Sequence, residues 1–164
     1  MVPLWHPTTG RVMERVTGIG GMFFRARDPD ALARWYAEHL GIDNQLEGGD
    51  TIWWQQRGPT VFAPFPADTD YFGRPEQTWM LNFRVRDLDA MVAQLRAAGV
   101  AIDNQETEEG AGRFAWLVDP EGNRIELWEP TPEVLEPADP PPAGRRDWKA
   151  SYDSGSTGPF RSAS

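Results

Sequence analysis

The same order of hydrophobic and polar residues occurs twice along the chain. FRARDPDA at residues 24–31 returns as FRVRDLDA at residues 83–90. Each phrase follows an apolar run, GIGGMFF or WMLNFRV, that is typical of a strand. Each leads into a segment whose apolar residues recur at helical spacing: Leu32, Trp35, Tyr36 and Leu40, then Met91, Val92, Leu95 and Ala98.

The polar positions of the repeat predict where both helices begin and end. Asp28 and Asp87 are suited to cap a helix N-terminus, and Pro29 suits a first helical position. Gly41 and Gly99 follow the last apolar position of each segment, as helix-ending glycines do.

The repeat continues beyond the helices. GIDNQ and AIDNQ are each followed by an acidic stretch with glycine, LEGGD or ETEEG, which we interpret as a turn. Strand candidates follow in each half: TIWWQQ and VFAPFP, then RFAWLVD and IELWEP. The pattern predicts an α+β fold of two tandem βαβββ modules, in which a curved mixed sheet encloses a cavity and the helices lie outside.

This organisation predicts one domain over residues 16–130, after an N-terminal appendage at residues 1–15. The modules occupy residues 16–66 and 79–130, joined by a linker at 67–78. Residues 131–164 are rich in proline, serine and glycine, and they predict a mostly irregular tail.

Charge and composition narrow the function. The net charge of −9 disfavours nucleic acid, because an acidic chain repels phosphates. There is no cysteine, so disulfides and thiol chemistry are excluded. No segment resembles a signal peptide or a membrane span. We therefore expect a cytoplasmic protein that contacts neither nucleic acid nor membrane.

The segment DPEGNRIELWEP at residues 119–130 combines a turn with a strand. Asp119 and Pro120 favour a tight turn, while Gly122 and Asn123 suit positive φ. In the strand that follows, alternation predicts that Ile125 and Leu127 face the helices. Three residues are then predicted to face the concave side: Arg124, Glu126 and Trp128.

These phrases together resemble the vicinal oxygen chelate superfamily, which contains glyoxalase I, extradiol dioxygenases and bleomycin-resistance proteins. The resemblance covers residues 16–130 and rests on RARDPDALARWYAEHLG, RVRDLDAMVAQLRAAGV and the closing DPEGNRIEL. It implies a ligand cavity between the modules and a homodimer.

Enzymes of this superfamily typically hold one divalent metal with four side chains, two from each module. Carried over to this sequence, those positions are Gly21, Phe62, Met80 and Glu126. Only Glu126 offers a hard oxygen ligand, so we expect no cofactor and no metal of the usual kind.

The resemblance also places further residues in the cavity. Arg25 and Arg84 are expected on opposite walls, where their guanidinium groups suit an anionic ligand or pair with internal acids such as Glu126. Phe23, Phe62, Met80, Asn82 and Trp128 are expected to line an apolar pocket suited to a flat molecule. Tyr71 in the linker is expected near the mouth of the cavity, as a hydrogen-bond donor or as part of a packed aromatic pair.

These residues are compatible with three functions. The first is metal-free binding of a small aromatic or anionic molecule, with drug sequestration as the biological role. The second is a lyase or isomerase in which Glu126 is the general base and Arg84 stabilises an oxyanion. The third is an interaction module whose tail binds another protein.

Overall fold

The structure is a computed structural model and describes residues 16–42 and 52–136. Its elements, in order, are helix α1 (Pro29–Leu40), strand β1 (Leu81–Arg84), helix α2 (Leu88–Ala97), strands β2 (Ile102–Glu108), β3 (Gly112–Val118) and β4 (Arg124–Pro130), and the short helix α3 (Pro132–Leu135). The mixed α+β class is therefore confirmed.

Both long helices begin where the capping residues predicted. The Asp28 carboxylate accepts a hydrogen bond from the Ala31 N–H (3.0 Å), and that of Asp87 accepts one from the Ala90 N–H (2.9 Å). Each bond satisfies one of the free N–H groups of a first turn. Gly41 ends α1 in the left-handed conformation at φ 66°, which glycine adopts without steric cost.

The four strands form one open sheet in the order β1-β4-β3-β2. β1 pairs with β4 in parallel, so that Asn82 lies opposite Glu126 and Arg84 opposite Trp128. The pairs β3–β4 and β2–β3 are antiparallel. Residues 81–130 thus make a complete βαβββ unit, with Glu126 in a central strand.

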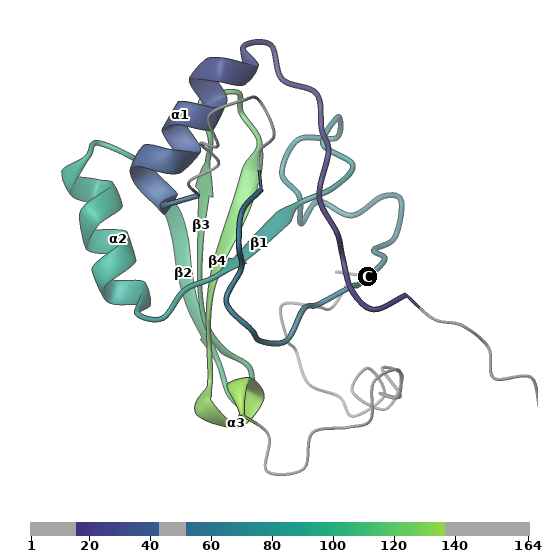
Figure 1. Cartoon of the computed structure of the whole chain (residues 1–164), viewed down its shortest axis with the longest axis vertical. Helices are drawn as coiled ribbons and strands as arrows, with labels where there is room; N and C mark the ends of the chain where they lie inside the picture. Colours follow the sequence, from purple (N-terminus) through teal and green to yellow (C-terminus); the bar gives the residue numbers. More distant parts are fainter. Residues whose placement is uncertain (1–15, 43–51, 137–164) are drawn as a thin grey trace, which may run out of the picture.

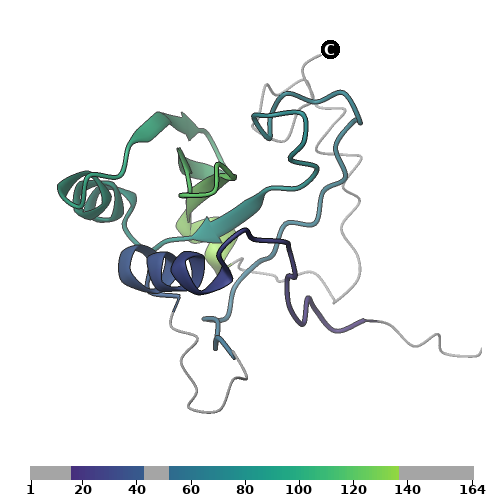
Figure 2. The same cartoon turned by 90° about the horizontal axis from the view of Figure 1, so that it is seen from above.

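The main core lies between the sheet and the two helices. Figures 1 and 2 show α1 and α2 on one side of the sheet and much of the 52–80 segment on the other. The residues buried in this core come from the inner faces of the two helices and from the helix-facing side of β3 and β4: Leu32, Tyr36, Leu88, Val92, Leu95, Ala115, Leu117, Ile125 and Leu127. Ile125 and Leu127 therefore face the helices as the alternation predicted.

The opposite face of the sheet carries a second, aromatic cluster. Phe114, Trp116 and Trp128 are buried there, with Tyr71 and Met80 packed against them. The predicted division of β4 into two faces is confirmed, since Glu126 and Trp128 share this second face through strand alternation.

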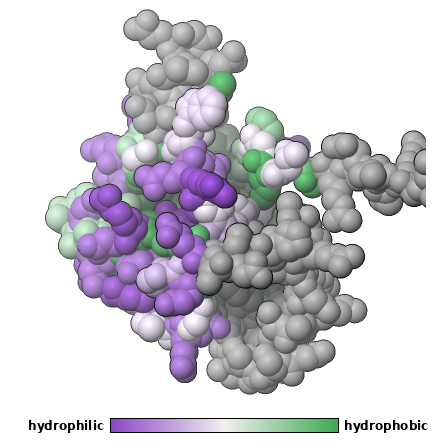
Figure 3. Space-filling model, turned by 60° about the horizontal axis from the view of Figure 1, so that its bottom comes forward, coloured by the Kyte–Doolittle hydropathy of each residue, from purple (hydrophilic) through white to green (hydrophobic). Residues whose placement is uncertain are grey.

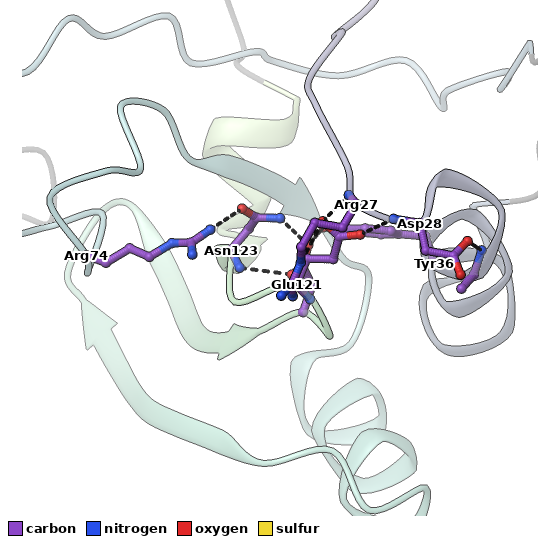
Figure 4. Close-up of polar contacts among 8 residues, drawn as sticks. Arg27, Asp28, Tyr36, Arg74, Glu121 and Asn123 are labelled. Atoms are coloured by element: carbon purple, nitrogen blue, oxygen red, sulfur yellow. Dashed lines mark hydrogen bonds and ion pairs between the residues drawn. The ribbon is translucent and has the colours of Figure 1, made fainter.

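The turn at Asp119–Asn123 joins the two halves of the chain (Figure 4). Buried Asp119 accepts hydrogen bonds from its own turn, at the N–H groups of Glu121 and Asn123 (both 2.9 Å). It also accepts one from the Tyr36 hydroxyl of α1 (3.0 Å). Burial raises the pKa of Tyr36, and the contact with Asp119 raises it further. The turn therefore fixes α1 against the sheet.

The side chain of Glu121 strengthens this joint from the same turn. Its carboxylate accepts hydrogen bonds from the backbone N–H groups of Arg27 and Asp28, each at 2.8 Å (Figure 4). These bonds lower the pKa of Glu121, because they favour the charged form. Of the two residues expected to suit positive φ, Gly122 has it (83°) and Asn123 does not. Asn123 instead donates its side-chain amide to Asp119 (2.8 Å).

The first half does not form the strands that its sequence predicted. Within the described residues, 16–28 and 52–66 contain no strand, and Phe23, Trp54 and Phe62 are 94%, 89% and 85% exposed. Glycines disfavour a strand in the first segment and prolines in the second, because glycine loses more entropy on folding and proline lacks the N–H donor. The tandem arrangement of modules and the domain boundaries therefore remain predictions.

The second half also departs from one expectation. The acidic stretch at 106–110 was interpreted as a turn, but its first part belongs to β2. β2 is a polar edge strand with mostly exposed residues, which gives it little hydrophobic alternation. The predicted appendage, tail and residues 43–51 lie outside the described residues.

The described surface has a polar face. Among the coloured residues in Figure 3, hydrophilic ones dominate, with smaller hydrophobic groups between and beside them. Among the described residues, no helix has the length and apolar character needed to cross a membrane.

We expect Tyr36→Phe to destabilise the fold, because it removes the hydroxyl donor to Asp119 while keeping the buried ring. The free energy of unfolding should fall by about 1–3 kcal/mol, as for a buried hydrogen bond to a charged group. Urea unfolding measures this change. Arg34→Gln, at an exposed position of α1, is the control and should stay within about 0.5 kcal/mol of wild type. Equal losses in the two variants would contradict the role of this joint.

Candidate functional site

A cleft of about 2420 Å³ lies between the first-half segments and strands β1 and β4. Its walls include all four positions that correspond to the superfamily's metal ligands: Gly21, Phe62, Met80 and Glu126. Asn82, Arg84, Tyr71 and Trp128 also line it. These residues therefore line one cleft, and their role in binding stays a prediction.

The carboxyl group of Glu126 is at the base of this cleft and is 1% exposed. Its Oε2 atom accepts a hydrogen bond from the Tyr71 hydroxyl, and its Oε1 atom accepts one from the Asn82 side-chain amide. Asn82 reaches it because the two residues are opposite each other in the β1–β4 pair. Glu126 therefore has neutral donors on both oxygens.

Burial raises the pKa of Glu126, because removal from water disfavours the charged form. The hydrogen bonds from Tyr71 and Asn82, a contact from the Trp116 indole and the charge of Arg124 all act in the opposite direction. Burial is the largest of these influences, so the group holds its proton to higher pH than an exposed glutamate. Burial and the neighbouring Glu126 likewise raise the pKa of Tyr71.

Tyr71 is held over Glu126 by the linker. Its ring stacks on Phe65 with centroids 5.2 Å apart and meets Trp116 edge-on at 6.2 Å. Two residues further along the linker fasten it to β4 and its turn. Arg74 donates to the Asn123 side chain (3.0 Å), and Gln77 bonds to the backbone of Arg124.

The Gln77 contact resembles a strand pairing. Its side-chain amide donates to the Arg124 carbonyl (2.7 Å), and its side-chain oxygen accepts from the Arg124 N–H (2.7 Å). β1 begins pairing only at Leu81 with Ile125, so the backbone of Arg124 lies beyond its reach. Gln77, 5% exposed, satisfies these two groups instead and sets the path of the linker.

The aromatic residues below the cleft form a parallel stack. The rings of Phe114 and Trp128 are 6.2 Å apart and 2° from parallel, and Phe114 and Trp116 are 6.1 Å apart at 20°. All three are at most 3% exposed. These three rings form a closely packed layer under the cleft, and Trp128 is the member that lines it.

Arg84 reaches from β1 to the wall of the cleft that the first half of the chain forms. One guanidinium nitrogen donates to the Gln56 carbonyl at 2.9 Å. Gly58 lies directly against the guanidinium, since a Cβ at this position would be 1.4 Å from Nη1. The structure therefore gives Arg84 a protein partner in the first half of the chain.

The other predicted site residues have different positions. Phe23 and Phe62 line the cleft from segments that are largely exposed to solvent. Arg25 is exposed and is not among the residues that line the cleft. The structure thus brings Tyr71, Met80, Asn82, Glu126 and Trp128 together, and it leaves Arg25 apart from them.

Sequence reasoning missed the roles of Gln77 and Arg124. No feature of the sequence indicated the role of Gln77, because its contact with Arg124 depends on where β1 starts. Arg124 was predicted to face the concave side through strand alternation, but the position of its guanidinium over the Trp116 ring was not foreseen. The Tyr71–Glu126 bond was also missed, although both residues had been singled out.

The residues of the cleft do not fit a divalent metal centre. Three of the four superfamily positions carry glycine, phenylalanine and methionine, which supply no hard ligand. Both oxygens of the fourth, Glu126, are engaged by protein donors. Among residues 16–42 and 52–136 there is no group of three acidic or histidine side chains suited to hold an ion.

Comparison with known proteins identifies the family. The family model described as a glyoxalase-like domain matches residues 21–128, more than half of the chain. The chain therefore belongs to the glyoxalase-like domain family. No curated protein matches it.

One solved structure shows the same fold. Lactoylglutathione lyase from Agrobacterium tumefaciens is 16% identical, with a TM-score of 0.50, and the match covers 74% of this chain and 100% of that one. A glyoxalase/bleomycin resistance protein from Streptomyces sp. CB03234 is 41% identical, with a TM-score of 0.28 over 30% of this chain and 42% of its own. TnmS3, an antibiotic binding protein from the same organism, is 27% identical, with a TM-score of 0.39 over 63% and 88%.

We expect Glu126→Gln to alter how stability depends on pH. The raised pKa of Glu126 means that the folded state binds this proton more tightly than the unfolded chain. The resulting stabilisation is complete below the unfolded-state pKa and is lost as pH rises through the folded-state pKa. Glutamine cannot titrate, so the variant does not lose this stabilisation. Its stability relative to wild type should therefore increase as the pH rises above 4.5, the ordinary pKa of a glutamate side chain.

Chemical unfolding at a series of pH values measures this difference. Glu133→Gln is the control, because Glu133 is exposed on α3. A constant difference between Glu126→Gln and wild type over this range would contradict the raised pKa.

Proposed function

We propose that this protein binds a small aromatic or anionic molecule in the cleft above Glu126, without a metal. The observation that carries the proposal is the buried Glu126 carboxyl group, held by Tyr71 and Asn82 at the base of a cleft. A concave, largely apolar site with a few fixed polar groups is the usual form of a small-molecule site. Glu126 and its donors orient the ligand, and Met80 and Trp128 contact its apolar part.

The relatives support a binding role. The antibiotic binding protein TnmS3 belongs to the structures similar to this chain, and drug sequestration is therefore the biological role that we propose. The acidic net charge supports a small-molecule partner over nucleic acid. We place the protein in the cytoplasm, in keeping with its lack of cysteine.

We also infer that the protein acts as a homodimer. Large apolar side chains are exposed in the first half, among them Phe23, Trp54 and Phe62. Exposed apolar groups of this size are typical of surfaces that contact another protein. Arg25, exposed on the same half, is proposed to contact the anionic part of a ligand from this side.

An enzymatic role is the second candidate, favoured by the raised pKa of Glu126. A carboxyl group whose pKa is raised is better suited to general acid–base catalysis than an exposed one. In a lyase or isomerase, Glu126 would take a proton from the substrate and Arg84 would stabilise the oxyanion. For any activity found, a Glu126→Gln variant with an unchanged rate would contradict this candidate.

We expect small aromatic compounds to quench the tryptophan fluorescence of the purified protein with saturation. Trp128 lines the cleft, so a bound aromatic ring comes close to its indole. Naphthalene derivatives serve as probes, and Met80→Trp, which adds bulk inside the cleft, should weaken their affinity by about tenfold or more. The control is Arg34→Gln, which should bind as wild type does.

Two results would contradict the proposal. One is quenching that never saturates for any compound tested. The other is a stoichiometric divalent metal in the purified protein, measured by elemental analysis.

A further inference from the structure

Arg124 is a cation beside the cleft whose side chain is fixed in place. It is the first residue of β4 and faces the same side of the sheet as Glu126. Its guanidinium carbon is 5.9 Å from the ring centroid of Trp116. Its stem passes below the linker at Gly73, where a Cβ would be 3.4 Å from Arg124 Cδ. Gln77 holds its backbone on both sides.

The guanidinium of Arg124 has no acidic partner within 4.0 Å in the described part of the chain. The ion pairs there involve Arg27 and Arg113 instead. The Nε–H of Arg124 is buried and makes no hydrogen bond. A buried donor without a partner costs about 1–3 kcal/mol, more when the group is charged. Arg124 therefore has unused capacity to bind an anion.

The surroundings of Arg124 belong to the cleft. Arg124 is not itself among the residues that line the cleft, but Gly73, Gln77 and Glu126, which lie around it, all do. Its positive charge lowers the pKa of both Glu126 and Tyr71. Arg84, in contrast, already donates to the Gln56 carbonyl and packs on Gly58. Of these two cations, Arg84 has a hydrogen-bonded partner in the protein, and Arg124 has a buried Nε–H donor without one.

We propose that Arg124 binds the carboxylate of the ligand, so that the site selects a planar aromatic acid over its neutral analogue. This inference rests on the proposed function and names the ligand class for the same cleft. The planar fork of a guanidinium matches a carboxylate with two parallel hydrogen bonds. Trp116 below the guanidinium fixes its plane, and the aromatic part of the ligand lies toward Trp128.

The test compares 1-naphthoate with 1-naphthamide by isothermal titration calorimetry at low salt. The two probes share a ring system and differ in charge. Wild type should bind the acid about tenfold more tightly, as expected for one charged hydrogen-bonded contact. Arg124→Gln should bind both compounds equally, with the affinity for the amide unchanged. Arg34→Gln, at an exposed position of α1 outside the cleft, should keep the preference for the acid.

Arg124→Lys is the second variant, and circular dichroism checks that each variant is folded. Lysine keeps the charge but lacks the fork, so its preference for the acid should be smaller than that of wild type. Equal binding of acid and amide by wild type would overturn the role of Arg124 and leave the cleft as a binding site. The same holds if Arg124→Gln retains the preference, or if Arg34→Gln loses it. If neither compound binds to wild type, the proposed function fails and this inference with it.

Discussion

The burial of the Glu126 carboxyl group is the constraint on which the rest of the site depends. A charged carboxylate is costly to remove from water, so a buried one needs donors or a proton. Here the strand pairing supplies Asn82, and the linker supplies Tyr71. The raised pKa shows that these donors offset only part of the cost of burial. The result is a polar group in an aromatic setting, with its orientation fixed before any ligand arrives.

The same constraint accounts for the way in which the linker is fastened. Tyr71 reaches Glu126 because Arg74 and Gln77 bind the linker to the start of β4. The turn before β4 also holds the first half of the chain. Asp119 binds the Tyr36 hydroxyl of α1, and Glu121 binds the backbone N–H of Arg27. One short segment, residues 119–126, therefore organises the helix packing on one side of the sheet and the candidate site on the other.

The parts that the sequence predicted well depend on local rules. Asp28 and Asp87 cap helices because a carboxylate at this position accepts a hydrogen bond from a free N–H group of the first turn. The two faces of β4 follow from strand alternation. The contacts that it did not predict join distant segments. Nothing near Gln77 indicates that its amide pairs with Arg124, and nothing in the apolar run around Phe62 indicates that this residue stays exposed. Strand propensity specifies a strand only when an edge is present to pair with it.

The pKa of Glu126 in the folded protein tests this account most directly. Selective ¹³C labelling of glutamate, with the signal assigned by its loss in Glu126→Gln, allows the carboxyl group to be titrated by NMR. We predict a midpoint above the ordinary value of 4.5, because the group is buried among neutral donors. A midpoint at or below 4.5 would mean that Glu126 is solvated or ion-paired, and it would contradict the site described here.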